Sequence, residues 1–148
     1  MRIVLILLLM SSLLGCARND GESSTSELEG LQGQWVVINY WAQWCAPCIE
    51  EIPELNRLNQ EYAQVTVLGV NYDGASGEEL EQQRQKLGVT FTSLKSDPAA
   101  QLGISRPAVL PTTLILDPNG QLVATLVGPQ TLTSLVQATE QDPNKALH

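Results

Sequence analysis

A pair of cysteines separated by two residues, in Trp44-Cys45-Ala46-Pro47-Cys48, is the sequence feature that most restricts the fold. The residues before it, 35–41, form an apolar, β-branched and aromatic run that is typical of a buried strand. In the residues after it, apolar side chains recur at spacings of three and four from Ile52 to Tyr62, as on one face of a helix. The pair is therefore predicted at a junction between a buried strand and a helix.

This position of Cys45, just before a helix, favours thiol chemistry. Only the thiolate attacks a disulfide, and a cysteine with an ordinary pKa of about 8.5 is mostly protonated at neutral pH. Unpaired backbone N–H groups and the positive end of the helix dipole stabilise an anion at a helix N-terminus. Cys45 is therefore the predicted nucleophile, and Cys48, one turn further along, is the predicted resolving thiol of a redox-active disulfide.

Other uses of two closely spaced cysteines compete with this interpretation. A zinc site needs further ligands, but the single histidine is His148 at the C-terminus, so no metal is expected. A c-type haem requires histidine directly after the second cysteine, where this chain has Ile49. A purely structural disulfide is still an alternative, although a loop of two residues constrains the unfolded chain very little.

The N-terminal residues have the pattern of a targeting signal. Arg2 precedes an apolar stretch over 3–10, which is shorter than the ~20 residues that span a bilayer. The ending Leu13-Leu14-Gly15-Cys16 resembles bacterial lipoprotein signals, in which cleavage precedes a cysteine that becomes lipidated. The resemblance implies a lipoprotein signal peptide over 1–15 and a lipid anchor at Cys16. Cleavage at an ordinary signal-peptidase site is the alternative.

The rest of the chain divides into two regions. Residues 16–30 are polar and small after the cysteine, which predicts a flexible tether with a reach on the order of 20 Å. Residues 31–148 have the length of one domain with one core. The chain has 8 basic and 16 acidic residues, a formal net charge of −8, so nucleic acid is not expected as a partner.

The remaining patterns predict an α/β domain with a mixed sheet. The elements after the first helix are a strand over 65–71, a surface helix over 78–87, a short strand within 89–94, a helical turn over 98–102, strands over 112–117 and 122–127, and a helix over 131–140. A helix connects the first two strands, so these two are predicted to be parallel. Asn119-Gly120 between two apolar runs predicts an antiparallel hairpin.

Two segments of this domain resemble the thioredoxin fold. The segment 39–48, Asn-Tyr-Trp-Ala-Gln-Trp-Cys-Ala-Pro-Cys, resembles the active-site signature of thioredoxin-fold proteins, and Leu110-Pro111-Thr112-Thr113 resembles their cis-proline loop. The resemblance implies a central mixed sheet flanked by helices, with the cysteine pair at the N-terminus of the first helix. Trp44, Leu110 and Pro111 would then border a groove for an extended substrate. An ordinary trans proline is the alternative for Pro111.

Within that fold, the closer resemblance is to the exported, membrane-anchored TlpA/ResA type. Asn39 stands where cytosolic thioredoxins carry a buried aspartate, and the exported type commonly has asparagine there. Glu51 matches a glutamate of the exported type that tunes the pKa of the cysteines; an exposed helix carboxylate beside Glu50 is the alternative. The helix over 78–87 looks like the insertion of that type, but its N-terminal strands have little room before Trp35.

The resemblance implies a membrane-tethered thiol:disulfide oxidoreductase of the bacterial cell envelope, facing the periplasm or extracytoplasmic space. Reduction of protein disulfides is the expected direction, with electrons from a membrane thiol-transferring protein and with apocytochromes c among the clients. A monomer with no cofactor besides its redox-active disulfide is expected. Two alternatives stay open: a disulfide oxidase or isomerase with the same site, and a thioredoxin-fold binding module whose disulfide is inert.

Overall fold

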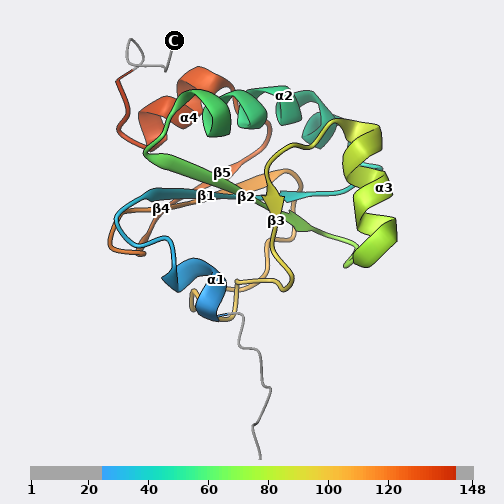
Figure 1. The fold of residues 1–148 in the computed structure, drawn as a ribbon, viewed down its shortest axis with the longest axis horizontal. Coiled ribbons are helices and arrows are strands. Elements are labelled where there is room, and N and C mark those ends of the chain that lie inside the picture. The colour runs from blue at the N-terminus through green and yellow to red at the C-terminus, as the bar shows by residue number, and fades with distance from the viewer. Residues whose placement is uncertain (1–24, 143–148) are drawn as a thin grey trace, which may run out of the picture.

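A mixed five-stranded sheet forms the centre of the computed structural model, which describes residues 25–142. The elements are α1 (Thr25–Glu29), β1 (Trp35–Trp41), α2 (Ala46–Glu61), β2 (Val65–Asn71), α3 (Gly77–Leu87), β3 (Thr92–Ser93), β4 (Thr112–Leu116), β5 (Leu122–Val127) and α4 (Leu132–Ala138). Figure 1 shows α2 and α4 together on one face of the sheet and α1 on the other. Residues 1–24, which include Cys16, and residues 143–148 lie outside the described part.

The strand order is β3-β2-β1-β4-β5, and it confirms the predicted mixed sheet. The central strand β1 pairs in parallel with β2, across the connection formed by α2, and antiparallel with β4. The turn at Asn119-Gly120 joins β4 and β5 as the predicted antiparallel hairpin. Because β1 and β4 run in opposite directions, the last residues of β1 and the first residues of β4 lie at the same end of the sheet.

Apolar side chains fill the space on both faces of the sheet. On the face covered by α2 and α4, the core includes Val37 and Leu55. On the opposite face it includes Ile38 and Leu114. All four side chains are completely buried, and burying each one contributes about 1.5–3 kcal/mol relative to leaving it in water. This double-sided burial explains why β1 reads as a continuous apolar run instead of an alternating one.

The predicted flexible tether, residues 16–30, contains a helix at its C-terminal end, which the sequence analysis did not predict. This helix is α1. Leu28 and Leu31 pack against the core on the α1 face of the sheet, and the Gly33 N–H donates to the carbonyl of Pro118 at 2.8 Å. Two leucines in a polar context gave too weak a pattern to predict this packing from the sequence. Within the described residues, no strand precedes β1.

The third predicted strand is much shorter than the pattern over 89–94 suggests. β3 has only two residues, which pair with Leu68 and Gly69 of β2. Val89 and Phe91 are buried in the core that α2 covers, so their apolar character reflects packing before the strand begins. None of the helices described within residues 25–142 is both long and apolar enough to cross a membrane.

Candidate active site

The two cysteines of the predicted redox pair form a disulfide between the end of β1 and the start of α2, with an S–S distance of 2.02 Å. Cys45 is the N-cap residue of α2, and its sulfur accepts a hydrogen bond from the Cys48 N–H at 3.3 Å. The Cys45 residue is 5% exposed, whereas Cys48 is completely buried. Cys45 is therefore the member of the pair that an incoming sulfur can approach, and it lies where the first backbone N–H groups of α2 have no partner within the helix.

Trp44 lies on the surface beside this disulfide. Its side chain is 64% exposed, and its indole N–H donates to the two carboxylate oxygens of Asp73 at 2.9 and 3.1 Å. Asp73 lies just after the end of β2, and the sequence analysis did not identify it as a partner of Trp44. The ion–dipole contact holds the indole in place while most of its apolar surface stays open to solvent. Trp44 is thus an ordered apolar wall next to Cys45.

The loop before β4 supplies a second wall. The Leu110–Pro111 peptide bond is cis, as the resemblance implied. Leu110 packs against the apolar cluster that contains both cysteines, so the fold brings this loop to the disulfide. Two hydrogen bonds fix its backbone: the Thr112 hydroxyl donates to the Val109 carbonyl at 2.7 Å, and the Gly128 N–H donates to the Pro111 carbonyl at 2.9 Å.

An apolar hollow of about 280 Å³ lies beside this loop. Val109 from the loop and Val127 from β5 contribute to its lining, and these two side chains are 55% and 62% exposed. β5 is the last strand in the sheet order, so its outer edge carries no further strand within the described residues. The hollow therefore places apolar surface between the loop that precedes β4 and an open sheet edge.

A buried carboxyl group lies behind the disulfide. Glu51 is only 1% exposed and lies on the same buried face of α2 as Cys48, one turn further along. Its Oε1 accepts from the Asn39 amide at 2.6 Å, and its Oε2 accepts from the Gln130 N–H at 2.8 Å. Burial raises the pKa of Glu51 to about 7, although both hydrogen bonds favour the carboxylate and oppose the rise. The alternative of an exposed helix carboxylate is wrong.

Asn39 connects this carboxyl group to the sheet. Asn39 on β1 is directly opposite Thr113 on β4, and its side-chain Nδ2 donates to the Thr113 hydroxyl at 3.0 Å as well as to Glu51. Its Oδ1 is buried and has no hydrogen-bond partner in the described part of the chain. Sequence reasoning named Asn39 and Glu51 but missed Thr113 and Gln130. Thr113 could have been found from the strand register, whereas Gln130 carries no local signal.

A polar cluster on the opposite face of the sheet anchors the segment that leads to the cis-proline loop. The Tyr40 hydroxyl and the Arg106 guanidinium donate to Asp97 at 2.7 and 2.8 Å. Burial and the nearby Asp97 carboxylate raise the pKa of Tyr40 above its ordinary range. Arg106 also lies 3.9 Å from the ring centroid of Tyr72, a cation–π contact that holds the segment on the end of β2.

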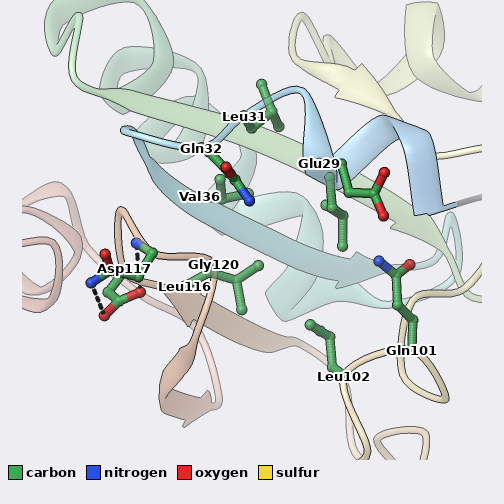
Figure 2. A pocket seen from close by; sticks show the side chains of 11 residues that line it. Glu29, Leu31, Gln32, Val36, Gln101, Leu102, Leu116, Asp117 and Gly120 are labelled. Atoms are coloured by element: carbon green, nitrogen blue, oxygen red, sulfur yellow. Dashed lines mark hydrogen bonds between the residues drawn. The ribbon is translucent and has the colours of Figure 1, made fainter.

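A separate cavity of about 190 Å³ lies under α1 and is shown in Figure 2. Its walls include Leu31, Val36 and Leu116, with Glu29 and Asp117 at the polar rim. Val36 and Leu116 pair with each other across β1 and β4, at the end of the sheet opposite the disulfide. The cavity does not take part in the redox site. Within residues 25–142, no group of three His, Cys, Asp or Glu residues could hold a metal ion.

Comparison with known proteins agrees with this geometry. A family profile described as AhpC/TSA family matches residues 14–125. The thioredoxin-like protein YneN of Bacillus subtilis is 32% identical over 121 residues, which are 79% of this chain and 70% of YneN. The thiol-disulfide oxidoreductase ResA of Geobacillus thermodenitrificans is 30% identical over 124 residues, 82% of this chain and 71% of ResA.

A solved structure shows the same similarity in three dimensions. The secreted thiol-disulfide isomerase from Corynebacterium glutamicum matches with a TM-score of 0.64 and 28% identity, over 76% of this chain and 72% of that chain. Fold and site together define a thioredoxin-fold protein with a Cys-x-x-Cys disulfide at the start of a helix. The chain belongs to the AhpC/TSA family, and it is a thiol-disulfide oxidoreductase of the ResA type.

Proposed function

We propose that this oxidoreductase reduces protein disulfides in the bacterial cell envelope, with Cys45 attacking and Cys48 resolving. The observation that supports this most strongly is the position of Cys45 at the N-cap of α2, where its sulfur accepts the Cys48 N–H. A thiolate at this position gains stabilisation from backbone N–H groups and from the helix dipole. The greater exposure of Cys45 supports the same assignment.

The proposed reaction consists of two thiol–disulfide exchanges. The Cys45 thiolate attacks one sulfur of a client disulfide, an intermolecular disulfide forms, and the client's other sulfur leaves as a thiolate that takes up a proton. The Cys48 thiolate then attacks the Cys45 sulfur, releases the second client thiol and forms the Cys45–Cys48 disulfide. Two electrons pass to the client in this sequence. A membrane protein with a dithiol restores the Cys45/Cys48 dithiol by a further exchange, in which its own two thiols are oxidised to a disulfide.

We assign to Glu51 the role of tuning this pair, with Asn39 holding its carboxyl group. Glu51 lies one turn after Cys48 on the buried face of α2. A carboxyl group with a pKa of about 7 exchanges protons near neutral pH, and the buried Cys48 thiol has to lose its proton before it can resolve the intermolecular disulfide. Asn39 has no titratable proton, so the acid–base group is Glu51.

The proposed client groove lies between Trp44 and the Leu110–Pro111 loop. Both walls are apolar, and the loop's backbone offers an edge along which an extended client segment can pair. The hollow lined by Val109 and Val127 adjoins this loop, and apolar residues of the client would occupy it. We propose that apocytochromes c are among these clients and that the enzyme acts as a monomer.

The proposed location rests on the N-terminal sequence. The lipoprotein signal pattern over 1–15 would leave Cys16 as a lipidated N-terminus and hold the domain near the membrane. A structurally similar isomerase is described as secreted, which agrees with an exported site of action. Mass spectrometry of the mature protein should find a lipid-modified Cys16 at the N-terminus. An unmodified Cys16, or a different first residue, would contradict the anchor.

Insulin reduction tests the catalytic proposal. The wild-type protein should accelerate the reduction of insulin by dithiothreitol severalfold, because Cys45 and Cys48 relay electrons to the insulin disulfides. A Cys45→Ser variant should show the rate of dithiothreitol alone. If that variant matches the wild type, or if the wild type gives no acceleration, the protein is better described as a redox-inert binding module.

The reduction potential of the Cys45/Cys48 couple tests the direction of electron flow. An oxidase or isomerase is a second candidate, because one similar structure is named an isomerase. Related disulfide exchangers span from about −270 mV for reductants to about −120 mV for strong oxidants. Equilibration with glutathione should place this couple nearer the reducing end. A potential near the oxidising end would favour the oxidase or isomerase.

A further inference from the structure

The hydrogen bonds around Glu51 suit only one of its two protonation states. Asn39 Nδ2 and the Gln130 N–H both donate to the carboxyl group. A carboxylate accepts both bonds, but a protonated carboxyl group also carries an O–H that needs an acceptor. The Gln130 backbone nitrogen cannot accept a hydrogen bond. Of these two partners, only Asn39 can offer an acceptor to the protonated form.

We propose that the Asn39 amide is a positioning group that rotates by about 180° when Glu51 takes up a proton, so that Asn39 Oδ1 replaces Nδ2 as the partner of Glu51. In the carboxylate state, Nδ2 donates to Glu51 Oε1 and to the Thr113 hydroxyl. In the protonated state, Oδ1 accepts from the Glu51 O–H and from the Thr113 O–H. Only the Asn39 amide and the Thr113 hydroxyl have to rotate.

The distances fit both orientations. The two ends of an amide occupy nearly the same positions after a half-turn. Asn39 Oδ1 would therefore come to lie about 2.6 Å from Glu51 Oε1 and about 3.0 Å from Thr113 Oγ1, the positions that Nδ2 has now. A separation of 2.6 Å is shorter than the usual range of N–H···O bonds and lies within that of O–H···O bonds. A threonine hydroxyl donates or accepts equally well, so Thr113 follows either orientation.

The unpartnered end of Asn39 explains why neither orientation is locked. Oδ1 is buried without a hydrogen-bond partner in the described part of the chain. Most buried polar groups have a partner, and a donor at that point would have fixed the amide. After rotation the NH₂ group occupies the same unpartnered place, so each orientation leaves one end of the amide without a bond. The protonation state of Glu51 then decides between them.

The other charged groups near Glu51 do not take part in this rotation. On α2, Glu50 is exposed, and the Glu54 carboxylate accepts from the Leu132 N–H at 2.8 Å. The segment before α4 contributes the Gln130 backbone, β1 and β4 contribute Asn39 and Thr113, and Cys48 precedes Glu51 on its own helix. Burial and the bonds from Gln130 and Asn39 are the factors that set the ionisation of Glu51.

The meaning of this rotation for catalysis rests on the proposed role of Glu51, but the rotation itself does not. With Asn39 rotated, the proton of Glu51 is held on Oε1, while Oε2 stays bonded to the Gln130 N–H. Both protonation states of Glu51 then keep two hydrogen bonds at this buried position. A carboxyl group that exchanges protons during the reaction needs this tolerance, because an unpaired buried donor or acceptor is destabilising.

Nuclear magnetic resonance of the full-length oxidised protein between pH 5 and 9 tests the proposal. The Asn39 side-chain amide signals should titrate with the same midpoint as the Glu51 carboxyl carbon. Nuclear Overhauser contacts from the Asn39 NH₂ protons to Thr113 should be present at high pH and disappear at low pH. The Asn56 amide, which donates to the Gly88 carbonyl at 2.7 Å, should keep its signals and serves as the control.

The Glu51→Gln variant provides a matched comparison, because its amide imitates the protonated carboxyl group at every pH. Its Asn39 signals should stay at the low-pH position of the wild type throughout. Contacts from the Asn39 NH₂ protons to Thr113 that persist while Glu51 titrates would overturn the proposal, since the signals would then report only the nearby charge. An enzyme that fails to reduce insulin but shows the rotation would refute only the proposed function.

Discussion

Burial is the main influence on the pKa of Glu51. The two hydrogen bonds that its carboxylate accepts compensate only partly for the hydration that it loses in the folded protein. The pKa of about 7 is the balance of these effects. The same shift has a consequence for stability, because the folded protein binds this proton more tightly than the unfolded chain does. Protonated Glu51 stabilises the fold fully below a pH of about 4.5, and this stabilisation is lost as the pH rises through about 7.

The Glu51→Gln variant should therefore become more stable relative to the wild type as the pH rises. The difference in free energy of unfolding between variant and wild type should grow by about 3 kcal/mol from pH 4.5 to 8, since each pKa unit corresponds to about 1.4 kcal/mol. Urea denaturation of both proteins at several pH values measures it. A difference that stays constant with pH would show that Glu51 titrates normally.

The position of Glu51 could be predicted in part from the sequence. Glu51 is three residues after Cys48 and four before Leu55, both of which are buried, so helical spacing already placed it on the apolar face. The reason to doubt burial was its charge, because unpaired carboxylates rarely lie in a core. Its partner Gln130 is 79 residues away, and only the fold brings the two together.

Among the elements, α4 depends most clearly on its first turn. The Thr131 hydroxyl accepts from the Ser134 N–H at 3.2 Å, and the Ser134 hydroxyl accepts from the Thr131 N–H at 3.0 Å. This reciprocal pair satisfies two N–H groups that a helix start leaves free. The Glu54 carboxylate accepts from the Leu132 N–H, which fixes the start of α4 against α2.

Replacing Thr131 tests this cap. Thr131→Ala should lower the free energy of unfolding by about 1 kcal/mol, because the Ser134 N–H loses its acceptor. Thr131→Ser keeps a hydroxyl and should behave like the wild type within about 0.5 kcal/mol. Thermal or urea unfolding followed by circular dichroism measures both variants. An equal loss in the two variants would assign the effect to the threonine methyl group instead of the cap.

The elements were predictable to different degrees for physical reasons. β1, β2 and α2 carry strong patterns because one or both of their faces are buried over their whole length. The β4–β5 hairpin was predictable from Asn119-Gly120, since few residues fit such a turn. For β3 the sequence predicted a strand within 89–94 but not its length of two residues, and α1 was not predicted, because each is short and its formation depends on packing against a finished sheet.

At the scale of the whole molecule, the redox site and the packing of α1 lie at opposite ends of the sheet. The disulfide lies at one end, and α1 closes the other end through Leu28 and Leu31. Leu28→Ala should lower the free energy of unfolding by about 1–2 kcal/mol, less than for a completely buried leucine, because Leu28 is only partly buried. The rate of insulin reduction by the folded protein should not change.

The exposed neighbour Glu29 provides the control for this prediction. Glu29→Ala should change stability by less than about 0.5 kcal/mol, as surface substitutions usually do. Urea unfolding and the insulin assay on both variants test the separation. A Leu28→Ala protein that is fully folded but slow in the insulin assay would show that the two ends of the sheet are coupled.

Trapping of intermolecular disulfides tests the roles of Cys45 and Cys48 most directly. Each single variant, Cys48→Ser and Cys45→Ser, is reduced and mixed with a disulfide-containing protein, and peptide mass spectrometry then locates the new bond. Cys48→Ser should accumulate an adduct through Cys45, because nothing resolves it, and Cys45→Ser should form little adduct through the buried Cys48. An adduct that forms mainly through Cys48, or no adduct in either variant, would contradict the proposed mechanism.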